Sequence, residues 1–293
     1  MPTRNLKLLI CGMAALLMLQ APLAVAATAA TVDLNQPAQK LEAYVRTVGD
    51  TSGKAVTTYA FGTVYAYVPG EKPRALFNLE VVGMGRYVKA TDGYQRLSRE
   101  IGYYTDLQSG EILTRWFNPY LQREVEVIPI QNDPVNRKFT VQNATYKVME
   151  QGDSITFYRE VPLRYPNALD RAGYPLYSSG DFYEAMEMFN NFVSRADLEN
   201  ERLTSLPSAG SWARLGPWLP WMEMALSPGS LVYHARSNKV LNGIEGLRPA
   251  LREYIASDNP KYLQAPAEFS APDETSWTFF KKLIDARRAA AKP

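Results

Sequence analysis

Two residue types useful for chemistry are nearly absent from this 293-residue chain: it has one cysteine, Cys11, and one histidine, His234. Zinc sites usually draw on several Cys and His ligands, and a nucleophilic triad would have only His234 as its base. The sequence also lacks a Gly-x-Ser-x-Gly elbow, a glycine-rich phosphate loop and an EF-hand loop. We therefore expect no metal, no cofactor and no nucleophilic hydrolase.

Long apolar runs are also absent after the N-terminus, where residues 1–26 have the three parts of a secretory signal peptide. Arg4 and Lys7 supply the positive charge, 8–19 is the apolar run, and Ala24-Val25-Ala26 is a cleavage site. The alternative is a membrane anchor, but the run is short for a span of about 20 residues. We predict cleavage near Ala26 and a periplasmic or secreted protein with no stable membrane span.

An excess of basic charge is missing as well. The chain has 32 basic and 30 acidic residues, and removal of 1–26 takes away two basic residues, which leaves 30 of each. Nucleic-acid binding depends on an excess of Lys and Arg, so no nucleic-acid partner is expected. Without Cys11 the exported chain cannot form disulfides, and burial must stabilise it. We expect a linker at 27–34 and one domain over 35–293.

From about residue 55 to 165 the sequence alternates with period two and is rich in β-branched and aromatic residues. Turn-forming pairs separate the strands expected at 57–68, 74–89, 94–104, 111–117, 124–131, 140–149 and 154–163. Helical spacing predicts helices over 36–48, 246–255 and 272–288. The fold class is therefore mainly β: an antiparallel, barrel-like sheet with N-terminal and C-terminal helices.

The segment 181–198 has two interpretations. As a helix it would place Glu184, Glu187 and Asp197 on a solvated face, whereas as a strand it would extend the wall of the barrel. We favour the strand because a barrel of this size needs more wall, and 230–241 is expected to be another strand. Gly83-Met84-Gly85 is expected to form a bulge or bend within its strand.

Three of the five tryptophans, Trp212, Trp218 and Trp221, fall within ten residues. Prolines between them restrict the backbone, so this stiff aromatic segment either lines a ligand pocket or plugs the end of the barrel. Arg214 lies between Trp212 and Trp218, and arginine can stack on indole rings and bind a carboxylate. The alternative role for Arg214 is a purely structural cation–π clamp.

The single histidine lies in the strand expected at 230–241. Strand alternation places His234 and Arg236 on one face and Tyr233 on the other. If His234 faces inward, it could act as a general base while Arg236 holds an anionic oxygen; the alternative is a wall or surface histidine. The discriminating observation is whether His234 and Arg214 point into the same cavity.

Two further groups are candidates. Asn118 precedes a proline beside Trp116, which favours a turn over ligand contact. Glu124 and Glu126 share one face of a strand. Paired carboxylates can supply acid–base catalysis when they face each other across a cleft, but a solvated outer face is the expected location here.

Four segments together resemble the domain-of-unknown-function family 1838: Trp116-Phe117-Asn118-Pro119-Tyr120, Asn132-Asp133-Pro134-Val135, Ser211-Trp212 through Trp221-Met222, and Ser276-Trp277-Thr278-Phe279-Phe280-Lys281-Lys282. The resemblance implies a bacterial or fungal protein that is often exported, and it carries over no activity. The similarity to calycin-type barrels is architectural only, because the Gly-x-Trp entry motif of lipocalins is missing.

The function expected from these observations is binding of a small apolar or aromatic molecule by an exported barrel protein. A cofactor-free lyase or isomerase, with His234 as its catalytic base and an arginine as anchor, is one form of it. The alternative is a non-catalytic carrier or an envelope structural or interaction protein. The expected ligand-binding residues are Arg214, Trp212, Trp218, Trp221, Trp116, Asn118, Tyr233 and Arg236.

Overall fold

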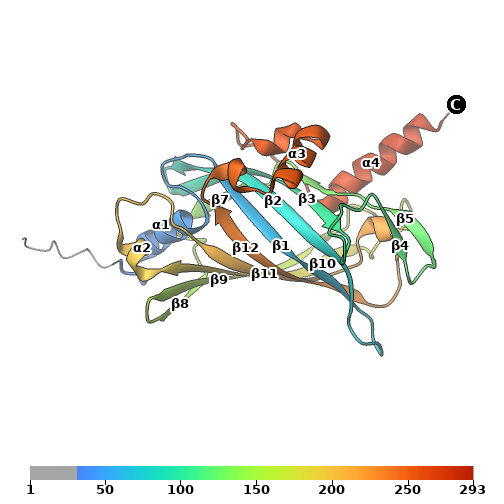
Figure 1. Ribbon diagram of the computed structural model, residues 1–293, viewed down its shortest axis with the longest axis horizontal. Coiled ribbons are helices and arrows are strands. Elements are labelled where there is room, and N and C mark those ends of the chain that lie inside the picture. The colour runs from blue at the N-terminus through green and yellow to red at the C-terminus, as the bar shows by residue number, and fades with distance from the viewer. Residues whose placement is uncertain (1–31, 293) are drawn as a thin grey trace, which may run out of the picture. The chain divides into compact units, whose positions relative to one another are not determined.

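The computed structural model describes residues 32–292, which are dominated by one antiparallel sheet (Figure 1). The expected mainly-β antiparallel class with a few helices is confirmed. The predicted signal peptide and residues 27–31 of the predicted linker lie outside the described residues. Among 32–292, no helix is long and apolar enough to span a bilayer.

The strands of this sheet pair in the order β6-β3-β2-β1-β12-β11-β10-β9-β8, and β7 also pairs with β3. A separate hairpin joins β4 and β5. Their bounds are β1 Val56–Tyr67, β2 Arg74–Ala90, β3 Gly93–Thr105, β4 Arg115–Asn118, β5 Arg123–Glu126, β6 Ile130–Asn132, β7 Arg137–Thr140, β8 Lys147–Gln151, β9 Ser154–Pro166, β10 Phe182–Ser194, β11 Ala209–Gly216 and β12 Ser230–Val240.

The two faces of the sheet differ. We call the face that carries Val64, Tyr104 and Tyr233 the inner face, and the opposite one the outer face. Gly62 shows how closely the backbones approach on the inner face, because a Cβ there would lie 2.2 Å from the carbonyl oxygen of His234. A residue with any side chain would force these two strands apart.

The hydrogen-bonded ladder of residues 32–292 does not close into a barrel. It ends at β6 and β7 on one side and at β8 on the other. A pocket of about 260 Å³ lies at this seam and takes lining residues from both sides, including Phe139 of β7 and Arg159 of β9. The expected closed wall is therefore replaced by a curled sheet whose two edges approach each other without pairing.

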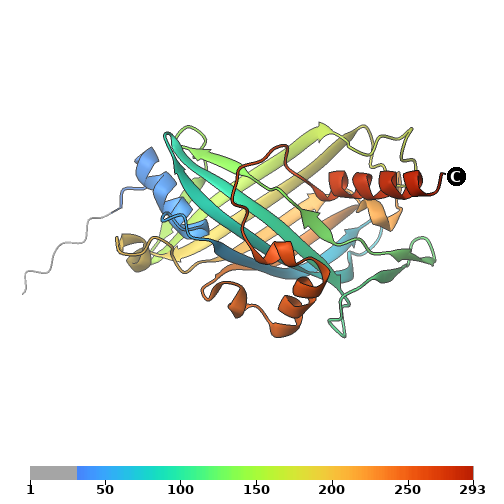
Figure 2. The same cartoon turned by 90° about the horizontal axis from the view of Figure 1, so that it is seen from above.

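Helices cover the ends of the inner face. α1 (Pro37–Val48) buries Leu41, Tyr44 and Val45 in one core. α4 (Ser276–Ala290) and the short helix η1 (Pro220–Met222) contribute to a second core, and Figure 2 shows α1 and α4 at opposite ends of the strands. The expected helix 36–48 is thus confirmed as α1.

The end of α1 is fixed by a buried lysine of β12. The ammonium Nζ of Lys239 donates to the carbonyl oxygens of Arg46 and Gly49, each at 2.8 Å, and to Ser205 Oγ at 2.8 Å. Cations stabilise the carbonyl end of a helix. Burial lowers the pKa of Lys239 to about 7, although Asp50 acts in the opposite direction.

Part of the outer face lies under α3 (Pro249–Asp258) and the short helices η2 (Gly243–Gly246) and η3 (Pro260–Leu263). Leu251 and Ile255 of α3 are buried there against Val82. The buried carboxylate of Glu80 accepts two hydrogen bonds from the guanidinium of Arg248, at 2.9 Å from Nε and 2.6 Å from Nη2. This bidentate pair attaches the start of α3 to β2.

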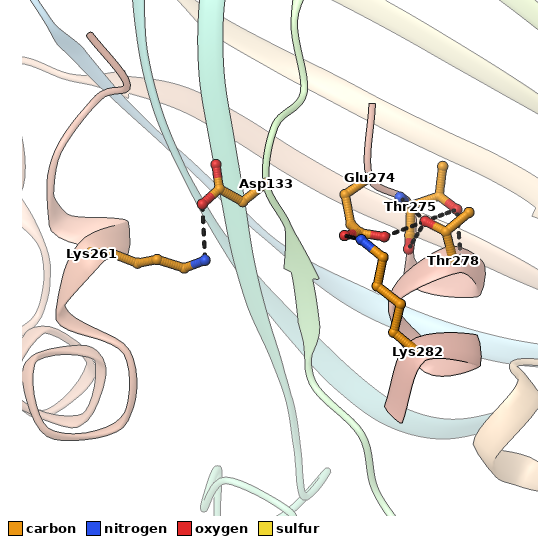
Figure 3. Close-up of polar contacts among 6 residues, drawn as sticks. All are labelled: Asp133, Lys261, Glu274, Thr275, Thr278 and Lys282. Atoms are coloured by element: carbon orange, nitrogen blue, oxygen red, sulfur yellow. Dashed lines mark hydrogen bonds and ion pairs between the residues drawn. The ribbon is translucent and has the colours of Figure 1, made fainter. Parts of the chain in front are cut away.

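The segment after β6 is tied to the chain that precedes α4. The carboxylate of Asp133 pairs with Lys261 Nζ at 2.9 Å (Figure 3) and with Arg99 Nε at 3.2 Å. The backbone N–H of Glu274 donates to the carbonyl oxygen of Pro134 at 2.8 Å. Two of the motifs noted in the sequence, 132–135 and 276–282, are therefore neighbours.

The first turn of α4 is capped by side chains of the same region. Thr275 and Thr278 form a reciprocal capping box. Thr278 Oγ1 also donates to Glu274 Oε1 at 2.5 Å, and Lys282 pairs with the same carboxylate (Figure 3). These contacts fix the start of α4 and with it the position of Trp277.

Several sequence predictions need correction. β11 was not expected, because the segment was interpreted as a proline-stiffened pocket lining or plug, and 111–117, 124–131 and 140–149 hold shorter or divided strands. The favoured strand within 181–198 is confirmed as β10, and only its last residues differ, because they begin α2 (Arg195–Glu199). Gly83 and Gly85 form no bulge, since β2 stays in register with β1 and β3 there; the register of β1 shifts at Val64/Tyr65 instead.

Candidate functional site

Arg214 lies on the inner face of β11 and is only 6 % exposed. In the sheet register its neighbours are Glu187 of β10 and Tyr233 of β12. Burial of a charged group is costly unless other groups compensate. The side chains around Arg214 therefore decide what this position can do.

Aromatic groups supply most of that compensation. Nη2 of Arg214 donates to Tyr183 Oη, and its Cζ lies 4.8 Å from the ring centroid of Tyr233 and 5.6 Å from that of Trp277. Nε lies 3.7 Å from Glu187 Oε1. Burial acts to lower the pKa of Arg214, but Tyr233, Tyr183 and Glu187 outweigh it, so the pKa is raised and the guanidinium stays charged.

A glycine makes room for this guanidinium. Gly216 lies two residues after Arg214 and shares its face of β11. A Cβ at Gly216 would lie 2.9 Å from both Cζ and Nη2 of Arg214. The position of the cation therefore depends on the absence of a side chain at residue 216.

Several buried hydrogen-bond donors in and near the site have no partner in the part of the chain that the structure describes. The indole N–H groups of Trp212, Trp221 and Trp277 are buried and have no hydrogen-bond partner among residues 32–292. The Trp277 ring packs against Arg214, and the Trp212 ring centroid lies 5.5 Å from that of Tyr233. Buried polar groups normally have a partner in protein, water or ligand. A bound group with acceptor oxygens would supply one.

Glu187 is the acidic member of the site and is 24 % exposed. Burial raises the pKa of Glu187, Arg214 and Arg159 act to lower it, and Glu100 acts to raise it further. Glu100 lies on β3, which four other strands separate from β10 in the sheet order. Its influence therefore acts across the curled sheet rather than along the ladder.

Between the two cores, the inner face is only partly covered. A band of half-buried side chains crosses it there, formed by Val81, Glu100, Arg159, Val161, Glu187, Phe189 and Trp212. Arg159 of this band also lines the 260 Å³ pocket at the seam. Arg159 therefore belongs both to the seam pocket and to the band that contains Glu187.

His234 and Arg236 do not join this site. Tyr233 faces inward beside Arg214, so strand alternation turns His234 and Arg236 outward, where both are exposed. The register places His234 between Ala213 and Thr63 on the outer face. A base at His234 beside an anchor at Arg214 is therefore ruled out by the geometry.

The tryptophan segment is divided between different surroundings. Trp218 lines a pocket of about 290 Å³ together with Tyr177 and Met224, and Arg214 is not among its lining residues. Trp218 Nε1 donates to the carbonyl oxygen of Ser227 at 3.2 Å. The sequence suggested that Arg214 stacks on Trp212 and Trp218. Its guanidinium lies instead over the rings of Tyr233 and Trp277.

Trp221 and Trp116 lie in the core to which α4 and η1 contribute. Their ring centroids are 6.1 Å apart in an edge-to-face arrangement. Trp221 is buried and its ring also packs against Phe77 and Tyr104. This arrangement matches the expected alternative in which part of the segment plugs the end of the sheet.

Asn118 has a structural role. Its Nδ2 donates to the carbonyl oxygen of Met222 at 2.8 Å, and its Oδ1 accepts from the backbone N–H of Tyr120 at 2.9 Å. Glu124 and Glu126 are exposed and pair with Arg115 and Arg287, in agreement with the solvated outer face expected for them.

Sequence reasoning missed Tyr183, Glu187, Gly216 and Trp277. Strand alternation from Tyr183 gives Tyr183, Glu187 and Phe189 a common face, so a committed strand interpretation would have found two of them. Nothing in the sequence places Trp277 of α4 beside β11, because that contact depends on how the C-terminal segment crosses the end of the sheet.

The comparisons with known proteins agree with the resemblance noted in the sequence. No curated protein matches the chain. Residues 53–284 match the model of a family described as proteins of unknown function, domain of unknown function 1838. Because the match covers most of the sequence, the chain belongs to this family.

Proposed function

We propose that this protein is exported and binds a small aromatic acid on the inner face of its sheet. The ligand's carboxylate pairs with Arg214, and its ring packs among Trp212, Tyr233 and Trp277. The observation that carries this proposal is the buried guanidinium of Arg214, which lies beside the indole N–H groups of Trp212 and Trp277 that have no partner among the described residues.

The chemistry of the surrounding groups supports an acid as ligand. Arginine binds carboxylates with a planar fork of N–H donors, and one end of the Arg214 fork is already held by Tyr183. An aromatic ligand is supported by the walls, since ring pairs and cation–π contacts stabilise flat guests. A flat, singly charged ligand satisfies both requirements.

Binding without catalysis is the form of this function that the geometry favours. The lyase or isomerase interpretation depended on His234 as base, and His234 lies on the outer face, away from Arg214. The proposal is therefore a carrier or binding protein. N-terminal sequencing of the protein from the periplasm or medium would test the exported location, with a mature start near Ala27 expected.

Calorimetric titration with benzoate and phenylacetate tests the binding proposal. We expect saturable binding of at least one acid and no binding of benzamide, which has the same ring without the charge. Arg214→Gln should weaken acid binding by about 10- to 100-fold, since a hydrogen bond to a charged group contributes about 1.5–3 kcal/mol. Arg236→Gln on the outer face is the matched control. Equal binding of benzamide, or unchanged binding by Arg214→Gln, would exclude the proposal.

A second candidate function is supported by the outer face of β10 and β11. Met188, Phe192 and Leu215 are exposed there and are not covered by α3. Exposed apolar patches often mark interaction sites, so this face would serve an envelope interaction protein. Cross-linking in the native compartment, compared between the wild type and Leu215→Glu, tests it: cross-links that persist unchanged in the variant would exclude this face.

A further inference from the structure

We infer that the site at Arg214 binds an organic acid together with one proton, and that Glu187 holds this proton. The inference rests on the proposed function and adds the chemical form of the ligand. It starts from the position of Glu187, whose carboxylate lies beside the group that would receive the ligand.

Glu187 and the proposed ligand would share one cation. Oε1 of Glu187 lies 3.7 Å from Nε of Arg214. A ligand carboxylate bound to the same guanidinium would therefore bring a second negative charge close to the first. Two carboxylates in one partly buried site cannot both stay ionised without a large energetic cost, so one of them takes up a proton.

The charges around Glu187 do not offset this cost. The cations acting on it are Arg214 of β11 and Arg159 of β9, and the other anion is Glu100 of β3. With Glu187 ionised, the two positive charges and the two negative charges of these four groups cancel. An anionic ligand would leave an uncompensated negative charge unless a proton binds as well.

The neighbouring tyrosines do not provide that compensation. Burial raises the pKa of Tyr233 to about 12 and also raises the pKa of Tyr165, so both hydroxyls are neutral near neutral pH. Tyr183 already accepts a hydrogen bond from Arg214. Unlike these hydroxyls, the carboxylate of Glu187 can change from charged to neutral as the acid binds.

Glu187 is also accessible to the proton. Its side chain is partly exposed, whereas Arg214 is almost completely buried. It belongs to the half-buried band that reaches the seam pocket through Arg159. Solvent can therefore supply the proton at this carboxylate.

The test is calorimetry of benzoate binding to the full exported chain near pH 7.5 in two buffers with different ionisation enthalpies. We expect uptake of about one proton per benzoate and a Kd that rises about tenfold per pH unit above neutrality, as linkage requires. Benzoate binding with no proton uptake and a Kd independent of pH would overturn this inference and leave the proposed function intact. If benzoate and phenylacetate both fail to bind, the proposed function itself is wrong.

Two variants identify the group that takes the proton. Glu187→Gln mimics the neutral acid, so benzoate should still bind, with proton uptake lost and a Kd that no longer depends on pH. His234→Gln on the outer face is the control, and it should keep the full uptake. Loss of uptake in His234→Gln, or its persistence in a folded Glu187→Gln, would overturn the assignment. The wild-type pH series decides the linkage itself if Glu187→Gln does not fold.

Discussion

Gly216 leaves the space that the guanidinium of Arg214 occupies. The two residues share the inner face of β11, and a Cβ at Gly216 would lie 2.9 Å from Arg214 Cζ and 3.2 Å from its Nη1. The proposed anchor for a ligand is therefore placed by a residue that contributes no side chain.

Gly216→Ala should move the guanidinium while the backbone of β11 is retained, because the far end of an arginine side chain can shift. We expect benzoate affinity to fall by about tenfold, equivalent to about 1.4 kcal/mol. Calorimetry measures this change, and circular dichroism checks that the sheet is intact. Leu215→Ala, next to it on the outer face, is the control and should bind normally. Unchanged affinity of Gly216→Ala would show that the ligand does not depend on this arrangement.

Arg214→Ala should lower the free energy of unfolding by about 3 kcal/mol, the loss typical when one partner of a buried charged pair is removed. The physical reason is that Glu187 and Tyr183 lose their partner and the rings of Tyr233 and Trp277 face a cavity. Urea denaturation of the variant and of exposed Arg236→Ala provides the comparison. A stability of Arg214→Ala equal to that of Arg236→Ala would mean that Arg214 is not a structural clamp.

His234→Ala should change neither stability nor benzoate binding by more than about 0.5 kcal/mol, as is usual for surface substitutions. The residue is exposed between Ala213 and Thr63 on the outer face. Thermal denaturation and calorimetry measure both quantities. A tenfold loss of binding would require His234 to reach the inner face, contrary to the register of β12.

Lys239 should make stability depend on pH in a defined window. Its pKa is lowered to about 7 in the folded state and lies at 10.5 for an ordinary lysine. Between these values the unfolded chain binds more protons, so the free energy of unfolding rises with pH through this window. This gain in the free energy of unfolding is complete only above pH 10.5, the ordinary pKa of lysine.

Lys239→Met provides the comparison, because it removes the titrating group and keeps the apolar stem. Urea denaturation at pH 6, 7.5 and 9 should show the wild type gaining stability relative to the variant as pH rises. The tyrosines with raised pKa values titrate above this range and affect both proteins alike. A constant difference between the two proteins from pH 6 to 9 would contradict the prediction.

The sequence was most informative where one period persisted over a whole element. The strands β1, β2, β3, β9 and β12 and the helix α1 were predicted nearly to their ends. Residue alternation defines the strands locally, and a proline at the start and a glycine after the end define the helix. β11 was missed because its glycines meet close approaches of neighbouring strands, as at Gly210, where a Cβ would lie 2.8 Å from the carbonyl oxygen of Asn190. Such crowding depends on curvature, which no local pattern reports.

For the site, the sequence identified Arg214 but not its partners. Tyr183 and Glu187 required a strand assignment for a segment whose pattern also allowed a helix, and that choice reverses Glu187 from a solvated face to the inner face. His234 shows the converse: its alternation with Tyr233 was correct, but alternation does not determine which face is inner. Which face His234 lies on follows only from the register of the full sheet.

The unpaired seam between β7 and β8 has a consequence for how a guest enters. No backbone hydrogen bond joins those two strands within residues 32–292, so the gap can widen without breaking the hydrogen-bonded ladder. Association should therefore be rapid even though the anchoring arginine is deeply enclosed, and a covalent staple across the two strands should slow arrival and departure together without altering equilibrium affinity.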